Sequence, residues 1–212
     1  MSDYKKAFIE LAISCNVLRF GEFKTKAGRL SPYFFNAGLF NNGNALRQLG
    51  QFYAKAIIAA QLPFDMLFGP AYKGIPLVSA IAIALAELGY NYPFCFNRKE
   101  LKDHGEGGMT IGAPLRGRVL IADDVISAGT SVQESVNIIR AEPAIPCGVI
   151  IALDRLEQGS NKISAVQEVK NLHHIPVISI INLDDIVDYL KNTDMQQNLQ
   201  AIEAYRERYG AR

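Results

Sequence analysis

The sequence predicts one α/β domain with a central parallel sheet flanked by helices, and three observations support this fold class. The chain has 212 residues, 49% hydrophobic and 20% charged, which suits a single globular core. Val119 to Ala122 form a short, apolar, β-branched run typical of a buried parallel strand. Similar short runs alternate along the chain with longer helical patterns, without an internal repeat or a linker to a second domain.

The N-terminal region predicts a helix over residues 3–16 and then a strand or hairpin over 17–23. Lys24, Lys26 and Arg29 surround a turn at Gly28, and the aromatic run 33–35 follows. Three successive aromatic residues cannot all face one core, because side chains alternate along a strand. One ring could therefore stack on a planar ligand. A strand buried on both faces explains the run equally well.

The central region predicts a helix over 44–61, a strand over 65–68, a tight turn at 69–76 and a helix that ends near Gly89. Tyr72 and Lys73 lie on that turn, which offers backbone amides and one ammonium group to a phosphate. The turn lacks the residue spacing of a P-loop. Residues 92–96 predict the next strand.

Residues 97–117 combine cationic side chains with five glycines and few apolar groups, so we expect a mobile surface loop. Most such runs are simply solvated. A long charged loop beside an anion site can also act as a lid.

The C-terminal third predicts strands over 148–154 and 177–181 and helices over 162–171, 184–191 and 196–208. Arg155 follows the first of these strands at its carboxyl end, where α/β sheets bind ligands. It could equally form a surface ion pair. His173 and His174 have no acidic residue nearby in the sequence, and we interpret them as structural.

An acidic pair and a small-residue loop follow the strand at 119–122. Asp123 and Asp124 come first, residues 127–131 are small or hydroxylic, and a helical pattern begins after them. Unpaired N–H groups and the helix dipole favour an anion at such a helix start, and Gly129 lets the backbone approach it closely. The aspartates would repel a phosphate, so they suit ribose hydroxyls or a water-bridged Mg²⁺. This arrangement predicts a site for a phosphorylated sugar. The alternative is a capping box over 130–133 beside a solvated acidic turn.

Residues 118–131 resemble the phosphoribosyl-diphosphate (PRPP) motif of the type I phosphoribosyltransferases. The stretches 20–36, 68–76 and 97–108 narrow the resemblance to the bacterial orotate phosphoribosyltransferases, and it extends over nearly the whole chain. Ser127 departs from the commonest form of the motif, where threonine is frequent, although either hydroxyl can donate the same bond. The resemblance implies a type I phosphoribosyltransferase fold in one domain over 1–212. It also implies a hood at about 17–40 with part of the C-terminus, and a flexible lid loop at about 98–117.

The resemblance further implies the transfer of phosphoribose from PRPP to orotate in pyrimidine biosynthesis, with Mg²⁺ as cofactor. It implies a homodimer in which the lid serves the neighbouring subunit, and a cis peptide between Ala71 and Tyr72. Mg²⁺ would be held mainly through PRPP and water, with the aspartate pair nearby. The implied catalytic residues are Lys102, His104, Asp123 and Asp124. The implied orotate contacts are Lys26, Phe34, Phe35, Ser127 and Arg155. The implied PRPP contacts are Lys26, Tyr72, Lys73, Arg98, Lys99, Lys102, His104, Asp123, Asp124, Val125, Ile126, Ser127, Ala128, Gly129, Thr130 and Ser131.

Composition argues against other classes of partner. The net charge of +1 provides no general field for nucleic acid, and no apolar run approaches the roughly 20 residues of a membrane span. Cys15, Cys95 and Cys147 are scattered, as in a reduced cytoplasmic protein. Two competing functions remain. One is a phosphoribosyltransferase for uracil or a purine base, and the other is a PRPP-sensing regulator that binds nucleic acid.

Overall fold

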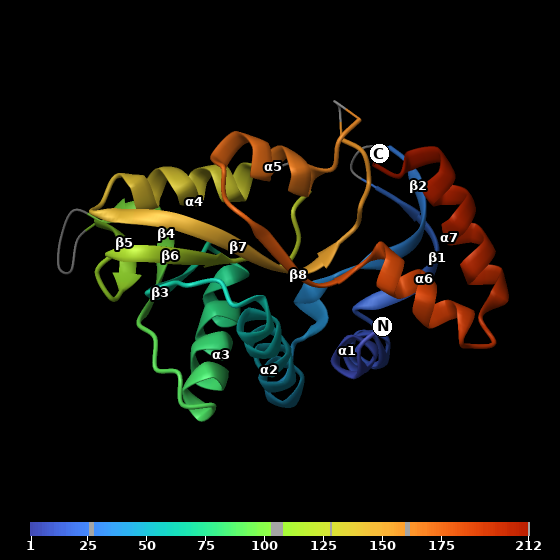
Figure 1. Cartoon of the computed structure of the whole chain (residues 1–212), viewed down its shortest axis with the longest axis horizontal. Coiled ribbons are helices and arrows are strands. Elements are labelled where there is room, and N and C mark those ends of the chain that lie inside the picture. The colour runs from blue at the N-terminus through green and yellow to red at the C-terminus, as the bar shows by residue number, and fades with distance from the viewer. Residues whose placement is uncertain (26–27, 103–107, 128, 160–161, 212) are drawn as a thin grey trace.

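A six-stranded sheet forms the centre of the protein in the computed structural model, which describes residues 1–25, 28–102, 108–127, 129–159 and 162–211 (Figure 1). Its strand order is β5-β4-β3-β6-β7-β8. All neighbouring strands are parallel except β5, which pairs antiparallel with β4. The predicted central parallel sheet is therefore confirmed, with one antiparallel strand added at its edge. The strands are β3 (Met66–Gly69), β4 (Phe94–Lys102), β5 (Gly108–Gly112), β6 (Gly117–Ala122), β7 (Ala144–Asp154) and β8 (Val177–Asn182).

Helices cover both faces of this sheet, which explains why its central strands are apolar on both sides (Figure 1). One face carries α2 (Gly43–Ala60) and α3 (Gly74–Glu87), and the other carries α4 (Thr130–Arg140) and α5 (Ala165–His173). In α2 the buried Leu49, Phe52, Tyr53 and Ile57 recur at the spacing of one helical face. The run from Val119 to Ala122 is completely buried, as predicted.

The N-terminal residues form a separate two-stranded unit at one end of the sheet. Strands β1 (Leu18–Lys24) and β2 (Leu30–Phe35) pair antiparallel, and α7 (Gln196–Tyr209) packs against β2. Helices α1 (Asp3–Ser14) and α6 (Leu183–Lys191) lie between this unit and β8, and a short 3-10 helix, η1 (Ala37–Leu39), leads on to α2. The aromatic run divides by face as expected for a strand: Tyr33 and Phe35 are buried, whereas Phe34 is 36% exposed.

The prediction of a loop over 97–117 is wrong for much of the described part of this segment, which forms strands. β4 continues to Lys102, and β5 returns antiparallel, with Asn97 opposite Thr110. The glycine content suggested flexibility, but Gly112 has a positive φ of 109° and its α-carbon packs closely against β4. It marks a close backbone approach at the sheet edge. Residues 103–107, which include His104, lie outside the described residues.

The described helices contain none that is both long and apolar enough to cross a membrane. The three cysteines are free thiols. Burial raises the pKa of Cys95 to about 12 and that of Cys147 to about 11, so both remain protonated near neutral pH. This agrees with the structural role expected for them.

Candidate active site

A cavity of about 1080 Å³ opens at the carboxyl edge of the sheet. The segments that follow β3, β6 and β7 form three of its walls, and the β1–β2 unit forms the fourth. Ligands of parallel α/β sheets bind at this edge because loops from several strands converge there. Among the predicted site residues, the cavity is lined by Phe34, Phe35, Tyr72, Lys73, Asp123, Asp124, Val125, Ile126, Ser127, Ser131 and Arg155.

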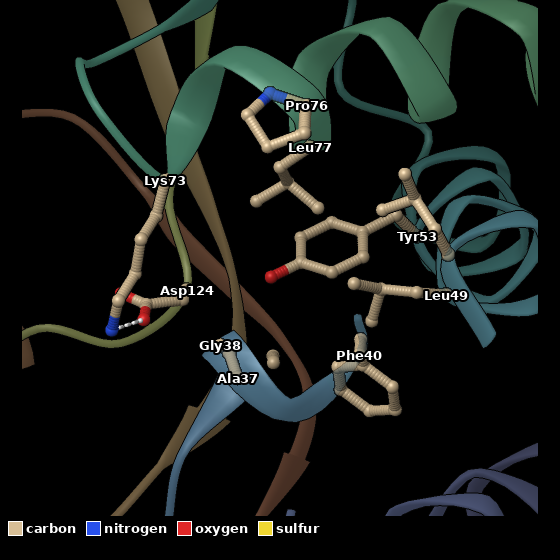
Figure 2. A pocket seen from close by; sticks show the side chains of 11 residues that line it. Ala37, Gly38, Phe40, Leu49, Tyr53, Lys73, Pro76, Leu77 and Asp124 are labelled. Carbon is tan, nitrogen blue, oxygen red and sulfur yellow. Dashed lines mark hydrogen bonds and ion pairs between the residues drawn. The ribbon is translucent and has the colours of Figure 1, made fainter. Parts of the chain in front are cut away.

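The acidic pair lies in the cavity wall directly after β6. Asp123 is buried, and its Oδ1 accepts a hydrogen bond of 2.8 Å from the backbone N–H of Asp124. Burial, together with the nearby charge of Asp124, raises the pKa of Asp123 to about 6. Asp124 Oδ2 accepts from Lys73 Nζ at 2.8 Å, so the two predicted ligand groups contact each other directly (Figure 2).

A buried tyrosine supports the acidic pair from the α2 side. The hydroxyl of Tyr53 donates to the backbone carbonyl of Asp123 at 2.8 Å. Its ring lines a second, small pocket of about 130 Å³, beside the Lys73–Asp124 ion pair (Figure 2). Because the other labelled side chains around this pocket are apolar, it does not suit a phosphate.

The segment 127–131, which the sequence predicts to bind a phosphate and which we call the phosphate loop, connects the acidic pair to α4. Gly129 is the N-cap residue with a positive φ of 71°, and no side chain caps the helix. The alternative capping box over 130–133 is therefore not formed. Ser127 and Ser131 line the cavity, so a helix start and hydroxyl donors face it together. Gly129 and Thr130 occupy the helix start itself, and Ala128 lies outside the described residues.

The turn after β3 has the predicted cis peptide between Ala71 and Tyr72. Asn97, at the carboxyl end of the apolar part of β4, holds this turn: its Oδ1 accepts from the backbone N–H of Ala71 at 2.7 Å. Tyr72 is 71% exposed at the cavity mouth. Asn97 thus fixes a turn whose residues 70–73 line the cavity.

Arg155 lies on the opposite side of the cavity, close to the β1–β2 unit. Its Nε donates to Glu157 Oε1 at 3.0 Å, and its Nη2 donates to Ser31 Oγ at 3.1 Å. The ion pair left open by the sequence is present, but it is mostly buried and lines the cavity. Phe34 stacks on Phe23 with 5.5 Å between ring centroids.

The structure does not bring every predicted residue into this cavity. Arg98 donates to the carbonyl of Gly108 at 3.4 Å, and Lys99 forms an ion pair of 3.3 Å with Glu134 on α4. Neither lines the cavity within the described part of the chain. Lys26, His104 and the side chain of Lys102 lie outside the described residues.

Sequence reasoning missed Tyr53, Asn97 and Glu157, each of which holds a predicted site group in place. Asn97 carried a local signal, because it is a polar residue directly after an apolar strand. Glu157 also carried a local signal, because it is an acidic residue only two positions after Arg155. Tyr53 carried none, because its partner is 70 residues away in the sequence.

The carboxylate oxygens of this site suit a hard divalent cation only if a bound substrate provides further oxygen ligands. The described residues contain no group of three or more side chains arranged to hold a metal ion. Asp123 and Asp124 provide carboxylate oxygens, the donor type that Mg²⁺ prefers, but one oxygen of Asp124 already contacts Lys73. Mg²⁺ therefore fits here if phosphate oxygens and water complete its coordination.

Comparisons with known proteins identify relatives along the whole chain. The profile of the family described as phosphoribosyl transferase domain matches residues 38–182. The orotate phosphoribosyltransferase of Nitrosospira multiformis is 70% identical, covering 100% of this chain and 93% of that protein. Its counterpart from Nitrosomonas europaea is 63% identical over 100% of this chain and 94% of that protein. The crystal structure of orotate phosphoribosyltransferase from Francisella tularensis has a TM-score of 0.88 at 42% identity, covering 96% of this chain and 99% of that one.

Proposed function

The chain belongs to the orotate phosphoribosyltransferases, and from that membership we propose that its cavity binds PRPP and orotate and produces orotidine 5′-phosphate and pyrophosphate. The single observation that carries this assignment is the cavity at the sheet edge, where the acidic pair, the uncapped helix start, Lys73 and Arg155 converge. The helix start, Lys73 and Arg155 match the negatively charged parts of the two substrates. The acidic pair matches the ribose hydroxyls. The reaction is a step of pyrimidine biosynthesis.

The 5′-phosphate of PRPP binds the loop from Ser127 to Ser131. The N-terminal end of α4 provides partial positive charge, and the first backbone N–H groups of a helix have no partner within the helix. Ser127 and Ser131 add hydroxyl donors. This loop fixes one end of the sugar and so aligns the reacting carbon with the acceptor.

Asp123 and Asp124 bind the two ribose hydroxyls. Their carboxylate oxygens accept hydrogen bonds, and their negative charge stabilises the positive character that develops on the ribose as the C–O bond breaks. The Lys73–Asp124 ion pair requires a rearrangement first, because the oxygen facing Lys73 at 2.8 Å has to become available to the sugar. Lys73 then serves the pyrophosphate.

The leaving pyrophosphate carries several negative charges, which cationic side chains neutralise. Lys73 approaches from the turn after β3. Arg98, Lys99 and Lys102 lie in β4, which together with β5 we call the lid hairpin. His104 donates a hydrogen bond or proton to the departing oxygen. Mg²⁺, held through PRPP and water near the acidic pair, would supply further charge neutralisation when bound.

Orotate binds on the side of the cavity formed by the β1–β2 unit. Phe34 and Phe35 provide aromatic and backbone surface, and Lys26 provides a cation. Arg155, which is held beside β2, and Ser127, which follows β6, provide donors. Arg155 and Phe34 both line the cavity, which supports a planar acceptor between them. An acceptor held there would face the ribose bound by the acidic pair.

We further propose a cytoplasmic homodimer in which the lid of one subunit serves the other. Two observations support the dimer: Arg98 and Lys99 do not line the cavity of their own chain, and exposed apolar side chains occur on the α2–α3 layer. These side chains are Ile58, Ile83, Leu88 and Tyr90. The free thiols are consistent with a reducing compartment.

An acceptor panel tests the proposed function. Purified protein, PRPP and Mg²⁺ are incubated separately with orotate, uracil, adenine and hypoxanthine, and pyrophosphate release is measured. Of the four bases, we expect only orotate to support pyrophosphate release. Turnover with another base and not with orotate would assign a different phosphoribosyltransferase. No turnover with any base, together with RNA or DNA binding at moderate salt, would favour a regulator.

A further inference from the structure

A mostly buried polar cluster surrounds Arg155 at the cavity wall, and Arg155 and Glu157 both line the cavity. Besides Glu157 and Ser31, it contains Tyr33, whose ring centroid lies 4.3 Å from the guanidinium carbon of Arg155. Ser31 is 1% exposed and Tyr33 is fully buried. Tyr205 of α7 contributes a buried hydroxyl to the same region, close enough for the charges of Glu157 and Arg155 to affect its pKa, which burial raises.

The contacts divide the donors of the guanidinium into two groups. Nε and Nη2 both donate to Glu157 Oε1, and Nη2 also donates to Ser31 Oγ. A guanidinium has five N–H donors, so the two on Nη1 remain. No residue in the described ranges accepts a hydrogen bond from Nη1. The protein therefore holds one edge of Arg155 and leaves one nitrogen for a ligand.

Glu157 is held firmly enough to act as the fixed partner. Glu157 follows β7, and the backbone on either side of it is bonded to the C-terminal residues. Ala211 N donates to Leu156 O at 2.8 Å, and Gln158 N donates to Tyr209 O at 2.9 Å. The hydroxyl of Tyr33 donates to the same carboxylate oxygen at 3.4 Å. Glu157 is thus fixed through its backbone and its side chain.

Burial makes this contact more consequential than an ordinary surface ion pair. The side chains of Arg155 and Glu157 are 21% and 16% exposed. Screening by water is weak at such a site, and a guanidinium that loses its partner there also loses its defined orientation. The Nε–Nη2 edge of a guanidinium can bind a carboxylate bidentately, but Glu157 and Ser31 already occupy the donors of this edge in Arg155.

We propose that Glu157 is a positioning residue that sets acceptor recognition by holding Arg155 so that only Nη1 faces the base. This inference rests on the proposed function, because it assigns the acceptor to orotate. A single nitrogen suits one oxygen of the planar acceptor. Glu157 also lines the cavity, but in this role it acts through Arg155 and not through a contact of its own with the substrate.

Two substitutions separate positioning from charge balance. Glu157→Ala removes the acceptor oxygen, so we expect KM for orotate to rise about tenfold or more, the effect of losing a charge-assisted hydrogen bond. Glu157→Gln keeps an oxygen at the same place, so KM for orotate should stay within about threefold of the wild type. In both variants KM for PRPP should not change, and kcat should change by less than about threefold.

Asp185→Asn provides the matched control. Asp185 forms an ion pair of 2.8 Å with Lys5, and the two side chains are 12% and 27% exposed, close to the values of the Arg155 pair. It does not line the cavity. We expect this variant to lower the thermal midpoint without changing either KM.

The outcomes distinguish the inference from the function on which it rests. Wild-type turnover of orotate supports the function, and only the pattern among the variants tests Glu157. An unchanged KM for orotate in Glu157→Ala would overturn the inference, as would an equal rise for orotate and PRPP. An equal rise in KM for orotate in the Ala and Gln variants would show that Glu157 balances the charge of Arg155 and does not position it. If Glu157→Ala does not fold, calorimetric affinities of the Gln variant for orotate and Mg²⁺–PRPP decide, and a large loss for orotate would contradict the inference.

Discussion

In the proposed mechanism the chemistry is carried by side chains at the carboxyl ends of the strands, and several of these side chains have a partner inside the protein. Asp124 faces Lys73, Asp123 is fixed by the amide of its neighbour, and Arg155 is held by Glu157. Such pairing restricts the orientations that each group can adopt before a substrate arrives. In the proposed mechanism, binding PRPP therefore exchanges the Lys73–Asp124 ion pair for contacts with the substrate.

The pKa of Asp123 leads to a prediction about stability. In the folded protein this pKa is about 6, above the ordinary value of 3.8, so the native state binds the proton more tightly than the unfolded chain does. The resulting stabilisation is present at low pH and is lost as pH rises through about 6. Relative to Asp123→Asn, the wild type should lose up to about 3 kcal/mol of unfolding free energy between about pH 4 and pH 7.

Chemical denaturation of both proteins in metal-free buffer across this pH range measures that difference. Parallel stability curves would show that Asp123 titrates normally and would contradict the burial argument.

Residue identities were more predictable from the sequence than residue contacts. The acidic pair, Ser127, Ser131 and Arg155 were expected at one site, and they line one cavity. Their supporting partners were not expected, because Tyr53 and Asn97 reach them through tertiary packing. Local pattern does not specify which buried polar group will meet which distant carbonyl or amide.

At the scale of elements, the junction between the phosphate loop and α4 depends on one glycine. Gly129→Ala places a β-carbon at a φ of 71°, about 3.4 Å from Val169 Cγ2, and costs about 1 kcal/mol of stability. Relief of that strain would turn the loop amides away from the phosphate, so KM for PRPP should rise at least fivefold while KM for orotate changes little.

Gly89→Ala is the control for this prediction. Gly89 has a similar φ of 88°, open space around it and a position after α3, outside the cavity. Steady-state kinetics should show a PRPP defect in the first variant only. Equal kinetics in both would mean that the amides at the start of α4 do not bind the phosphate.

The lid hairpin gives a second prediction at this scale. Lys102→Ala should lower turnover at least tenfold and leave the unfolding midpoint unchanged, because a preorganised charged contact of this kind contributes about 2.7–4 kcal/mol. Lys191→Ala, an exposed lysine at the end of α6, is the control and should behave as the wild type. Wild-type turnover in Lys102→Ala would show that the lysine has no catalytic contact.

The central elements were predictable because α2 has a strong hydrophobic periodicity and β6 contains a continuous apolar run. The β4–β5 hairpin was not predictable, because glycines and charged residues interrupt the alternation of apolar and polar residues in β5 and in the second half of β4. Pairing with the neighbouring strand determines its conformation, and that pairing leaves no clear trace in composition.

At the scale of the whole molecule, a shared lid predicts complementation between two inactive variants. Lys102→Ala removes a lid contact, and Asp124→Asn removes a cavity contact. If each site combines the cavity of one subunit with the lid of the other, mixed dimers contain one intact site. After unfolding and refolding together, an equal mixture should recover about a quarter of wild-type activity.

Each variant refolded alone serves as the baseline for that measurement. Recovery no greater than the sum of the two baselines would place the lid and the cavity of each site in the same subunit.

The most direct measurement of the central claim is calorimetric titration of the purified protein with Mg²⁺–PRPP at two temperatures. The cavity at the carboxyl edge of the sheet predicts saturable binding of one PRPP per chain, at least tenfold weaker in Gly129→Ala and unchanged in Gly89→Ala. Absence of saturable binding at both temperatures, or equal affinity in the two glycine variants, would contradict it.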